Sequence, residues 1–414
     1  MTRPALEPTD RMDEDSIGRI ATWVASAGLA GKSEMALLRG FAERCRAAGL
    51  ALTRAGALID TLHPTYEGRA FRWRSDGVEE PVVEYGPSGQ GEAAAAWRRT
   101  AFYHLYTTGA GEVRRRIGFG EPADFRYLPE LKDAGYTDYV AMFQRFAAGG
   151  VIGEMDGLYS HWSTDHPQGF GDADLAALRR LVPHLALAVK CASVARIAGT
   201  LVDVYLGRDA GHRVLGGRIA RGVAETIHAV LWFSDLRGYT AISESAPPDE
   251  VIPLLNDYAG VVIGSVQESG GDVLKLVGDG TLAIFKDDDP GTACRRALEA
   301  EARLRSRAAE LNVRRAAEGR PVTTVYLGLH IGDVFYGNIG SDDRLDFTVV
   351  GPAVNEVSRI ASMCRSVDRR VLVSSDFVAA AGEGERARFV SVGRFALRGV
   401  GQARELLTLD PDLV

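Results

Sequence analysis

Two acidic residues at the ends of apolar runs constrain this chain more than any other feature. The run 229–233 leads into Ser-Asp235 and a glycine-containing turn, which predicts a buried strand that ends at a carboxylate. A second run, 273–277, is followed by Gly-Asp279-Gly and a third run, 281–285, which predicts a tight β-hairpin with Asp279 in its turn. Carboxylate oxygens on neighbouring strand ends suit a pair of Mg²⁺ ions.

A third segment carries two polar side chains spaced four residues apart. Asn355 and Arg359 would share one face of a helix. Each of the three pieces is common by itself, because a strand-end Asp usually caps a turn and helix-surface Asn and Arg are usually solvated. Their occurrence in this order, with Lys275 four residues before Asp279, favours a shared chemical role.

Together the three segments resemble the catalytic domain of class III adenylyl cyclases. The matching blocks are Phe-Ser-Asp-Leu-Arg-Gly-Tyr-Thr, Lys-Leu-Val-Gly-Asp-Gly and Asp-Phe-Thr-Val-Val-Gly-Pro-Ala-Val-Asn-Glu-Val-Ser-Arg, and the resemblance covers roughly residues 225–410. The expected element order, β-α-β-β-α-β, is that of a ferredoxin-like core, as in these cyclases. The resemblance implies conversion of ATP to 3′,5′-cyclic AMP and pyrophosphate, through attack of the ribose 3′-hydroxyl on the α-phosphate.

The resemblance also implies a set of metal and phosphate ligands. Asp235 and Asp279 are expected to bind two Mg²⁺ or Mn²⁺ ions per site, with the backbone carbonyl of Leu236 as a third ligand. The backbone N–H groups of the following turn are expected to hold the β- and γ-phosphates. These groups belong to Leu236, Gly238, Tyr239 and Thr240.

Base recognition and transition-state stabilisation are assigned in the same way. Lys275 would donate to a ring nitrogen of adenine and Thr348 would read the exocyclic amine, since a hydroxyl can accept as well as donate. Asn355 would orient the ribose, and Arg359 would stabilise charge on the α-phosphate, an effect of ~3–4 kcal/mol. Arg398 matches a phosphate-contacting position that is often Lys. Guanylyl cyclases typically carry Glu and Cys at the two base-reading positions, which argues against GTP.

In the family, two catalytic domains pack head to tail and share each site. One chain would supply Asp235 and Asp279, and its partner would supply Lys275, Asn355 and Arg359 together with Thr348. Because every required residue type is present, a homodimer with two equivalent sites is expected. Two alternatives stay open: a guanylyl or relaxed-specificity cyclase, and a catalytically silent nucleotide-binding regulator.

The first 170 residues mix expected helices and strands without a parallel βαβ rhythm, which predicts an α+β domain. The segment that begins Gly169-Phe-Gly-Asp resembles the exit helix of GAF-type sensor domains, so residues 1–170 are expected to receive an unidentified input. Residues 171–222 are expected to form a long helix, 172–205, and then a Gly- and Arg-rich articulated linker. The helix would pair with its copy in a dimer or, alternatively, dock on its own sensor domain. Residues 223–414 are expected to be the catalytic domain.

Local patterns predict further elements in both halves. Helices are expected at 16–48, 93–103, 248–265 and 291–311, with a short helix or turn at 128–134. Strands are expected at 51–62, 69–74, 140–146, 153–163 and 322–331, and the last is expected to continue into a turn at 332–339.

Composition limits the compartment and the partners. The net charge of −7 argues against a general nucleic-acid surface. The four cysteines are far apart and lack C-x-x-C spacing, which predicts reduced thiols and no structural zinc site. No run of 18 apolar residues is present and residues 1–14 are polar and acidic, so neither a membrane span nor a signal peptide is expected. These features predict a cytoplasmic protein.

Overall fold

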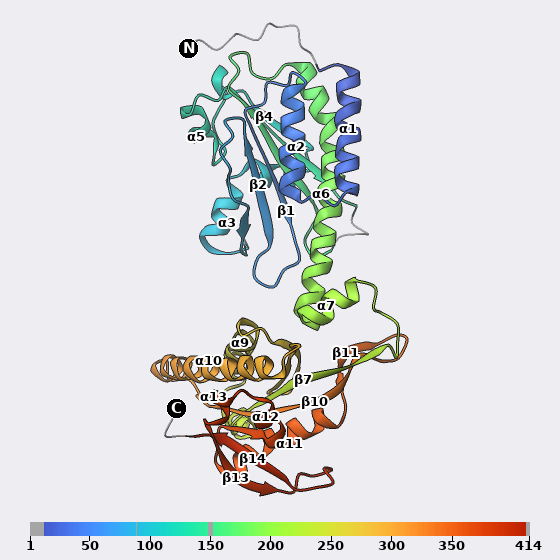
Figure 1. Cartoon of the computed structure of the whole chain (residues 1–414). Coiled ribbons are helices and arrows are strands. Elements are labelled where there is room, and N and C mark those ends of the chain that lie inside the picture. Colours follow the sequence, from blue (N-terminus) through green and yellow to red (C-terminus); the bar gives the residue numbers. More distant parts are fainter. Residues whose placement is uncertain (1–11, 88, 148–151, 411–414) are drawn as a thin grey trace. The chain divides into compact units, whose positions relative to one another are not determined.

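The computed structural model describes residues 12–87, 89–147 and 152–410 (Figure 1). The chain divides into two compact units, Met1–Leu201 and Val202–Val414. Both units combine helices with a largely antiparallel sheet, which confirms the mixed α+β class expected from the sequence.

A six-stranded antiparallel sheet forms the centre of the first unit, in the order β3-β2-β1-β6-β5-β4. Its strands are β1 (Arg54–Asp60), β2 (Gly68–Arg74), β3 (Val83–Tyr85), β4 (Glu112–Arg115), β5 (Asp138–Arg145) and β6 (Gly157–Thr164). The four predicted strands of this half are confirmed with shifted ends. The sequence missed β3 and β4, because three- and four-residue strands with charged side chains carry almost no periodic signal.

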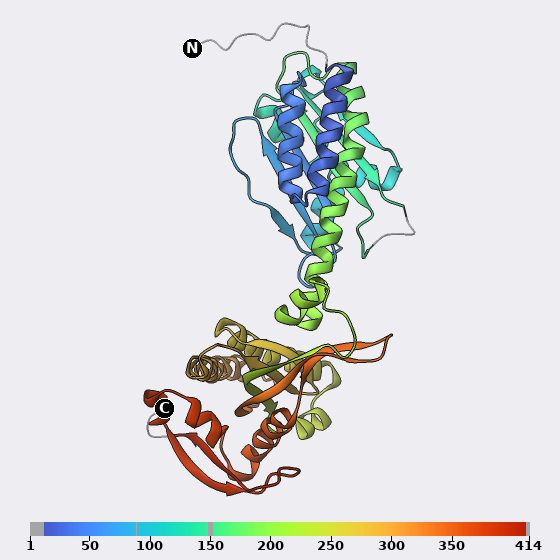
Figure 2. The same cartoon turned by 45° about the vertical axis from the view of Figure 1, so that its right-hand side comes forward.

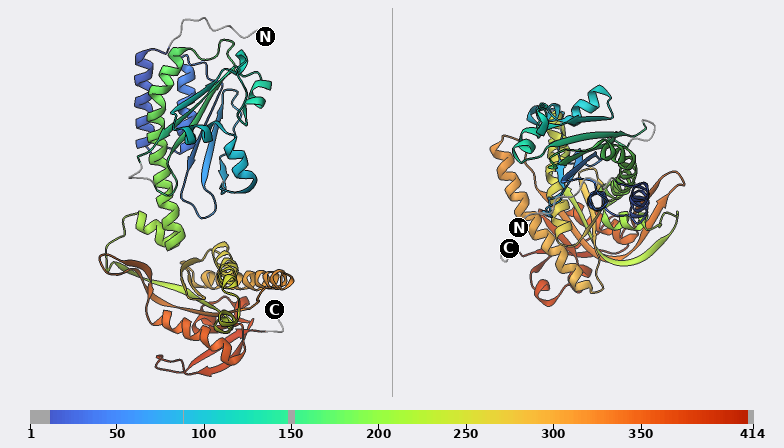
Figure 3. Two further views of the ribbon diagram at one scale, coloured as in Figure 1. Left: turned by 180° about the vertical axis from the view of Figure 1, so that it is seen from behind. Right: turned by 90° about the horizontal axis from the view of Figure 1, so that it is seen from above.

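Helices cover both faces of this sheet. The long helices α1 (Glu14–Leu29), α2 (Glu34–Ala47) and α6 (Asp172–Leu206) lie side by side on one face (Figures 1 and 2). The other face carries short helices, visible from behind in Figure 3, that pack on an aromatic cluster containing Tyr139 and Tyr159. They are α3 (Gly91–Arg98), α4 (Ala101–Thr108), the 3₁₀ turn η1 (Ile117–Phe119) and α5 (Leu128–Asp133).

Two predicted helices are each divided in the structure. The stretch 16–48 breaks where Gly31 adopts φ 67° and the Ser33 side chain caps α2 by accepting from Ala36 N–H. The stretch 93–103 breaks at Thr100, whose hydroxyl accepts from Tyr103 N–H at 3.1 Å. In both cases the apolar pattern continues across the break, and a Ser or Thr side chain caps the start of the second helix.

The helix α6 extends over 35 residues and passes through Pro183 without interruption. The sequence predicted it almost to the residue. Within the described part of the chain it is the one helix long and apolar enough to cross a membrane, whereas no span was expected. A single such helix is weak evidence for a span, because core helices pass the same test, and Leu178, Val182 and Leu185 of α6 belong to the core of its unit.

An eight-stranded sheet forms the centre of the second unit, in the order β13-β14-β12-β10-β7-β9-β8, with β11 paired to the far half of β10. The pair β10–β12 is parallel and the other pairs are antiparallel. The strands are β7 (Ala224–Leu236), β8 (Asp272–Val277), β9 (Gly280–Phe285), β10 (Val325–Gly340), β11 (Leu345–Val350), β12 (Val371–Ser374), β13 (Phe389–Phe395) and β14 (Arg404–Leu409).

Helices α9 (Pro248–Glu268) and α10 (Pro290–Ala317) cover one face of this sheet, and α11 (Pro352–Val367) covers the other (Figure 1). The order β7-α9-β8-β9-α10-β10 confirms the predicted ferredoxin-like arrangement. The remaining helices are short: α7 (Arg208–Leu215), α8 (Tyr239–Ser245), α12 (Ser375–Ala380) and α13 (Glu383–Arg386).

The expected articulated linker, 206–222, contains the short helix α7, whose Ala210 packs in the core with Leu231 and Leu274. One expectation for this unit is wrong. The segment 332–339 does not leave the sheet as a turn. It continues β10, because β7 and β11 supply hydrogen-bonding partners on its two edges.

Candidate active site

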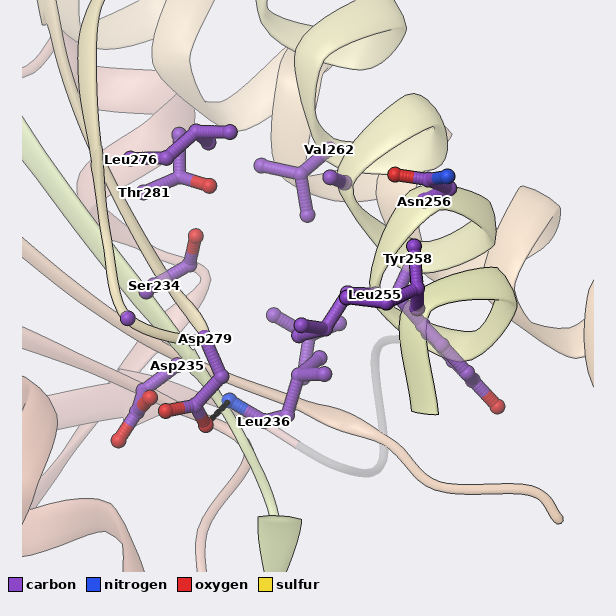
Figure 4. Close-up of a pocket in the computed structure, with 15 residues that line it drawn as sticks. Ser234, Asp235, Leu236, Leu255, Asn256, Tyr258, Val262, Leu276, Asp279 and Thr281 are labelled. Carbon is purple, nitrogen blue, oxygen red and sulfur yellow. Dashed lines mark hydrogen bonds between the residues drawn. The ribbon is translucent and has the colours of Figure 1, made fainter. Parts of the chain in front are cut away.

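The two predicted acidic ligands lie next to each other. Asp235 is the penultimate residue of β7, and Asp279 lies in the turn between β8 and β9. The strands β7 and β9 pair through Ser234 and Thr281, so the end of β7 adjoins the hairpin turn. The N–H of Leu236 donates to Oδ2 of Asp279 at 3.3 Å, which ties the turn to the strand end (Figure 4).

Glycine on each side of Asp279 makes this approach possible. Gly278 has φ 64°, in the region that favours glycine. At Gly280, a Cβ would lie only 2.9 Å from the carbonyl oxygen of Ser234 and 3.2 Å from that of Val277. The turn therefore requires glycine at position 278, and the close contact between the hairpin and β7 requires glycine at position 280.

The electrostatics of this pair fit a cation site. Burial, then the hydrogen bond and negative charge of Asp279, raise the pKa of Asp235 to about 7, although the N–H of Leu236 acts in the opposite direction. Two carboxylates this close resist joint ionisation unless a positive charge lies between them. Their hard oxygen atoms are the ligands preferred by Mg²⁺ and Mn²⁺, so the donor set fits the expected metals.

A cavity of about 170 Å³ adjoins the two carboxylates. Figure 4 shows that α9 forms its opposite wall, with Leu255, Asn256 and Val262 facing the strands. The sequence predicted α9 but not that it lines this cavity, because its apolar residues are typical of any helix that packs on a hydrophobic core.

The predicted base-reading residues lie on neighbouring strands. Lys275 of β8 forms an ion pair with Asp346 of β11, and its side chain is partly exposed. Two residues further along β11, Thr348 is buried, and its Oγ1 has no hydrogen-bond partner among the described residues. Asp346 was not predicted as a partner of Lys275. The two positions are 71 residues apart, so only the pairing of strands brings them together.

Asn355 and Arg359 lie on α11 with the predicted i, i+4 spacing and are exposed. Arg398 is exposed between β13 and β14. Within the described residues none of these three side chains has a hydrogen-bond or ion-pair partner. Nor does any such interaction join Asp235 or Asp279 to the base-reading or α11 residues. One chain therefore presents the predicted residues as separate groups.

The predicted phosphate-binding turn is partly occupied by internal hydrogen bonds. The N–H of Leu236 is bonded to Asp279, and that of Arg237 donates to the carbonyl of Thr324 at 2.8 Å. The N–H groups that point out of the turn begin at Gly238, which has φ 69° and precedes α8. Tyr239 and Thr240 form the first turn of that short helix, where N–H groups have no intrahelical acceptor.

Comparison with known proteins finds a family that resembles this unit. Residues 224–408 match the family described as the adenylate and guanylate cyclase catalytic domain. An adenylate cyclase of Anabaena cylindrica is 33% identical over 157 residues, which cover 38% of this chain and 31% of that relative. An uncharacterised protein of Mycobacterium tuberculosis is 35% identical over 206 residues, covering 48% of this chain and 35% of its own length. The chain thus spans about a third of the length of the curated relatives it matches.

Solved structures of cyclases also resemble part of the chain. The adenylyl cyclase CyaB from P. aeruginosa has 23% sequence identity and a TM-score of 0.41, over 45% of this chain and 96% of that one. The guanylyl cyclase Cya2 has 27% identity and a TM-score of 0.40, over 45% and 95%. Residues 224–408 of the second unit thus resemble the catalytic domain of adenylate and guanylate cyclases, over a little under half of the chain.

Proposed function

We propose that this cyclase domain makes 3′,5′-cyclic AMP and pyrophosphate from ATP, at two equivalent sites shared across a homodimer. The observation that carries the proposal is the meeting of Asp235 and Asp279, held by the bond from Leu236 N–H to Asp279. The adenylate cyclase of Anabaena cylindrica supports the reaction class, and the absence of the guanylyl-type Glu and Cys at positions 275 and 348 favours ATP.

In this proposal Asp235 and Asp279 would hold two Mg²⁺ or Mn²⁺ ions. Such ions, when bound, activate the 3′-hydroxyl and neutralise the triphosphate.

The proposed base-reading pair consists of Lys275 and Thr348. Nζ of Lys275 would exchange its ion pair with Asp346 for a ring nitrogen of adenine, and the unpaired Oγ1 of Thr348 would accept from the exocyclic amine. An unsatisfied buried hydroxyl costs free energy that a base partner would recover. Since a hydroxyl can also donate to the carbonyl of guanine, relaxed base selection is the second candidate function.

The remaining predicted groups act on the ribose and the phosphates. Asn355 would orient the ribose, and the unpaired guanidinium of Arg359 would stabilise the charge that develops on the α-phosphate. Arg398 and the N–H groups of Gly238, Tyr239 and Thr240 would bind the β- and γ-phosphates.

Sharing of sites between two chains is supported by the separation of these groups within one chain. Exposed apolar side chains on the same strands also support it, among them Val277 of β8, Ile339 of β10 and Val350 of β11. Such side chains are typical of surfaces that pair in an assembly. We further propose that residues 1–170 form a GAF-like sensor domain that regulates the cyclase. The six-stranded antiparallel sheet between two helical layers supports this assignment.

Complementation tests the shared site. Asp279→Ala and Arg359→Ala homodimers should each be inactive with Mn²⁺ and ATP. An equimolar mixture of the two variants should regain about a quarter of wild-type activity, because half of its dimers are mixed and each of these has one intact site of two. Cyclase assays of the wild-type protein with ATP alone and with GTP alone show which base the enzyme selects. A turnover of GTP equal to that of ATP would replace the adenylyl assignment by a relaxed-specificity cyclase, and no turnover of either would favour a silent regulator.

A further inference from the structure

A second cluster of polar side chains lies away from the proposed active site. His330 of β10, Glu356 of α11 and Asp376 of α12 each place one ligand atom within 4.8 Å of the other two. His330 and Glu356 are buried and Asp376 is exposed. Asp235 on β7 pairs with Tyr326 on β10, and His330 lies four residues further along β10. The cluster is therefore about 13 Å along the strand from the level of Asp235.

The charge around this cluster favours a cation. A cavity of about 500 Å³ is lined by the three residues together with Asp333 and Arg404. Three carboxylates against one guanidinium give this cavity an excess of negative charge, which attracts cations and repels anions.

The imidazole of His330 is oriented as in a metal ligand. Its Nδ1 lies 2.8 Å from Oγ of Ser374, which also accepts from the N–H of Phe377 at 3.1 Å. When Nδ1–H is the donor in this contact, Nε2 keeps its lone pair. Nε2 faces Gly332, where a Cβ would lie 3.3 Å away. Metal-binding histidines commonly donate from the other ring nitrogen in this way.

Glu356 contributes a buried carboxylate that is paired with Arg404 of β14. Its Oε1 forms an ion pair with Nε of Arg404 at 3.0 Å but accepts no hydrogen bond among the described residues. Its Oε2 accepts from Nη2 of Arg404 at 3.3 Å. Arg404 therefore contacts both oxygens, but a carboxylate has about four acceptor positions, so the lone pairs that do not face Arg404 can bind a cation.

We propose that His330, Glu356 and Asp376 bind a divalent transition-metal ion, of which Zn²⁺ is the best match, separately from the catalytic cations. One imidazole and two carboxylates are ligands that Zn²⁺ accepts, with water completing four positions. Ligand atoms at 2.0–2.2 Å from one ion are about 3.4 Å apart in a tetrahedron, so shifts of about 1 Å close the site. Because Glu356 adjoins Asn355 on α11, the ion would fix the helix that carries Asn355 and Arg359.

Metal binding to the full-length protein tests the proposal without measuring activity. The protein carries Asp235→Asn and Asp279→Asn to remove the proposed catalytic site, and is stripped with chelator and titrated with Zn²⁺ or Co²⁺. We expect one ion per chain by atomic emission, with visible absorption from Co²⁺. His330→Ala and Glu356→Gln should each weaken binding at least tenfold, and Ser374→Ala about tenfold. His212→Ala, an exposed histidine of α7, should leave it unchanged.

Two further variants keep the test decisive. Asp376→Asn changes an exposed ligand without altering the core, so its expected loss of affinity does not depend on refolding of the buried site. Arg404→Gln removes the competing positive charge and should raise Zn²⁺ affinity. Equal binding by wild type, Glu356→Gln and Asp376→Asn would identify the ion as adventitious and overturn the proposal. Weaker Zn²⁺ binding by a folded Arg404→Gln variant would also contradict it.

Discussion

Among single residues, Asp235 couples the candidate site most directly to pH. Its pKa is raised to about 7, first by burial and then by Asp279, from an ordinary value of 3.8. Between about pH 4 and 7 the folded protein therefore holds a proton that the unfolded chain releases. Ionisation of this group costs stability as the pH rises through that window, and the full cost is present above pH 7.

Asp235→Asn removes this cost. In metal-free protein at pH 8 we expect the variant to be more stable than wild type by on the order of 1 kcal/mol, after allowance for solvent screening of a partly exposed group. At pH 4 the two proteins should unfold at the same temperature. Thermal unfolding with chelator at both pH values measures the difference. An equal gain at pH 4 and pH 8 would show that packing, and not charge, is responsible.

Arg359 should act on the rate and not on the fold. Its side chain is exposed and unpaired, so Arg359→Ala should leave the unfolding temperature unchanged. It should lower kcat for ATP by about 100- to 1,000-fold, the usual loss for one transition-state donor. Arg365→Ala is the matched control, because Arg365 is also exposed on α11. A fall of kcat in both variants, or in neither, would contradict the assigned role.

Single residues also mark the limit of what the sequence could predict. Asp235, Asp279 and the spacing of Asn355 and Arg359 follow from local patterns, and the structure places them on the expected elements. The partner of Lys275 could not be predicted, because Asp346 reaches it only through the placement of β11 beside β8.

Among the elements, the β8–β9 hairpin has the least tolerance for added volume. Gly280→Ala would place a methyl group 2.9 Å from the Ser234 carbonyl. We expect a loss of stability of about 1–3 kcal/mol, as for other overpacked sites, with loss of cyclase activity because Asp279 moves away from Asp235. Denaturant unfolding and a cyclase assay report the two effects.

Gly260→Ala gives the opposite expectation in a neighbouring element. Gly260 lies inside α9, and no atom comes within 4 Å of a Cβ built there. The substitution should stabilise the protein by about 0.5–1 kcal/mol through helix propensity and leave activity intact. If both glycine variants lost stability equally, the close contact at Gly280 would not be the cause.

Elements in which apolar residues recur at a regular helical or strand spacing were predicted well, and elements without such a spacing were not. The Gly-Asp-Gly turn between two apolar runs predicted β8 and β9, and three- and four-residue spacing predicted α6. In contrast, α7 lies in a Gly- and Arg-rich segment, and its apolar residues become informative only beside β8. The second half of β10, predicted as a turn over 332–339, belongs to the sheet because β7 and β11 pair with it on its two edges.

For the whole molecule, the proposed shared site makes activity depend on assembly. Specific activity should fall when the protein is diluted below the dissociation constant of the dimer, by mass action. Val350→Asp places a charge among the exposed apolar side chains of β11 and should weaken the dimer. The protein concentration at which specific activity falls should then rise at least tenfold. Val78→Asp is the control, since Val78 is similarly exposed but lies in the first unit.

Sedimentation at the same concentrations separates assembly from chemistry. We expect the decline in activity to follow the monomer fraction for wild type and for both variants. A monomer with full specific activity would contradict the shared site.

The glycine between α6 and α7 has a consequence for how any input reaches the catalytic domain. Gly207 has φ 83°, and a Cβ there would lie 2.5 Å from the carbonyl oxygen of Val273, two residues before Lys275 on β8. On the other side of this contact, Asp209 holds Lys286 at 2.9 Å. The backbone that follows α6 therefore packs directly against β8, the strand that carries Lys275, with no side chain between them. If the proposed sensor domain moves the end of α6, the displacement would act directly on β8 and so on the placement of Lys275.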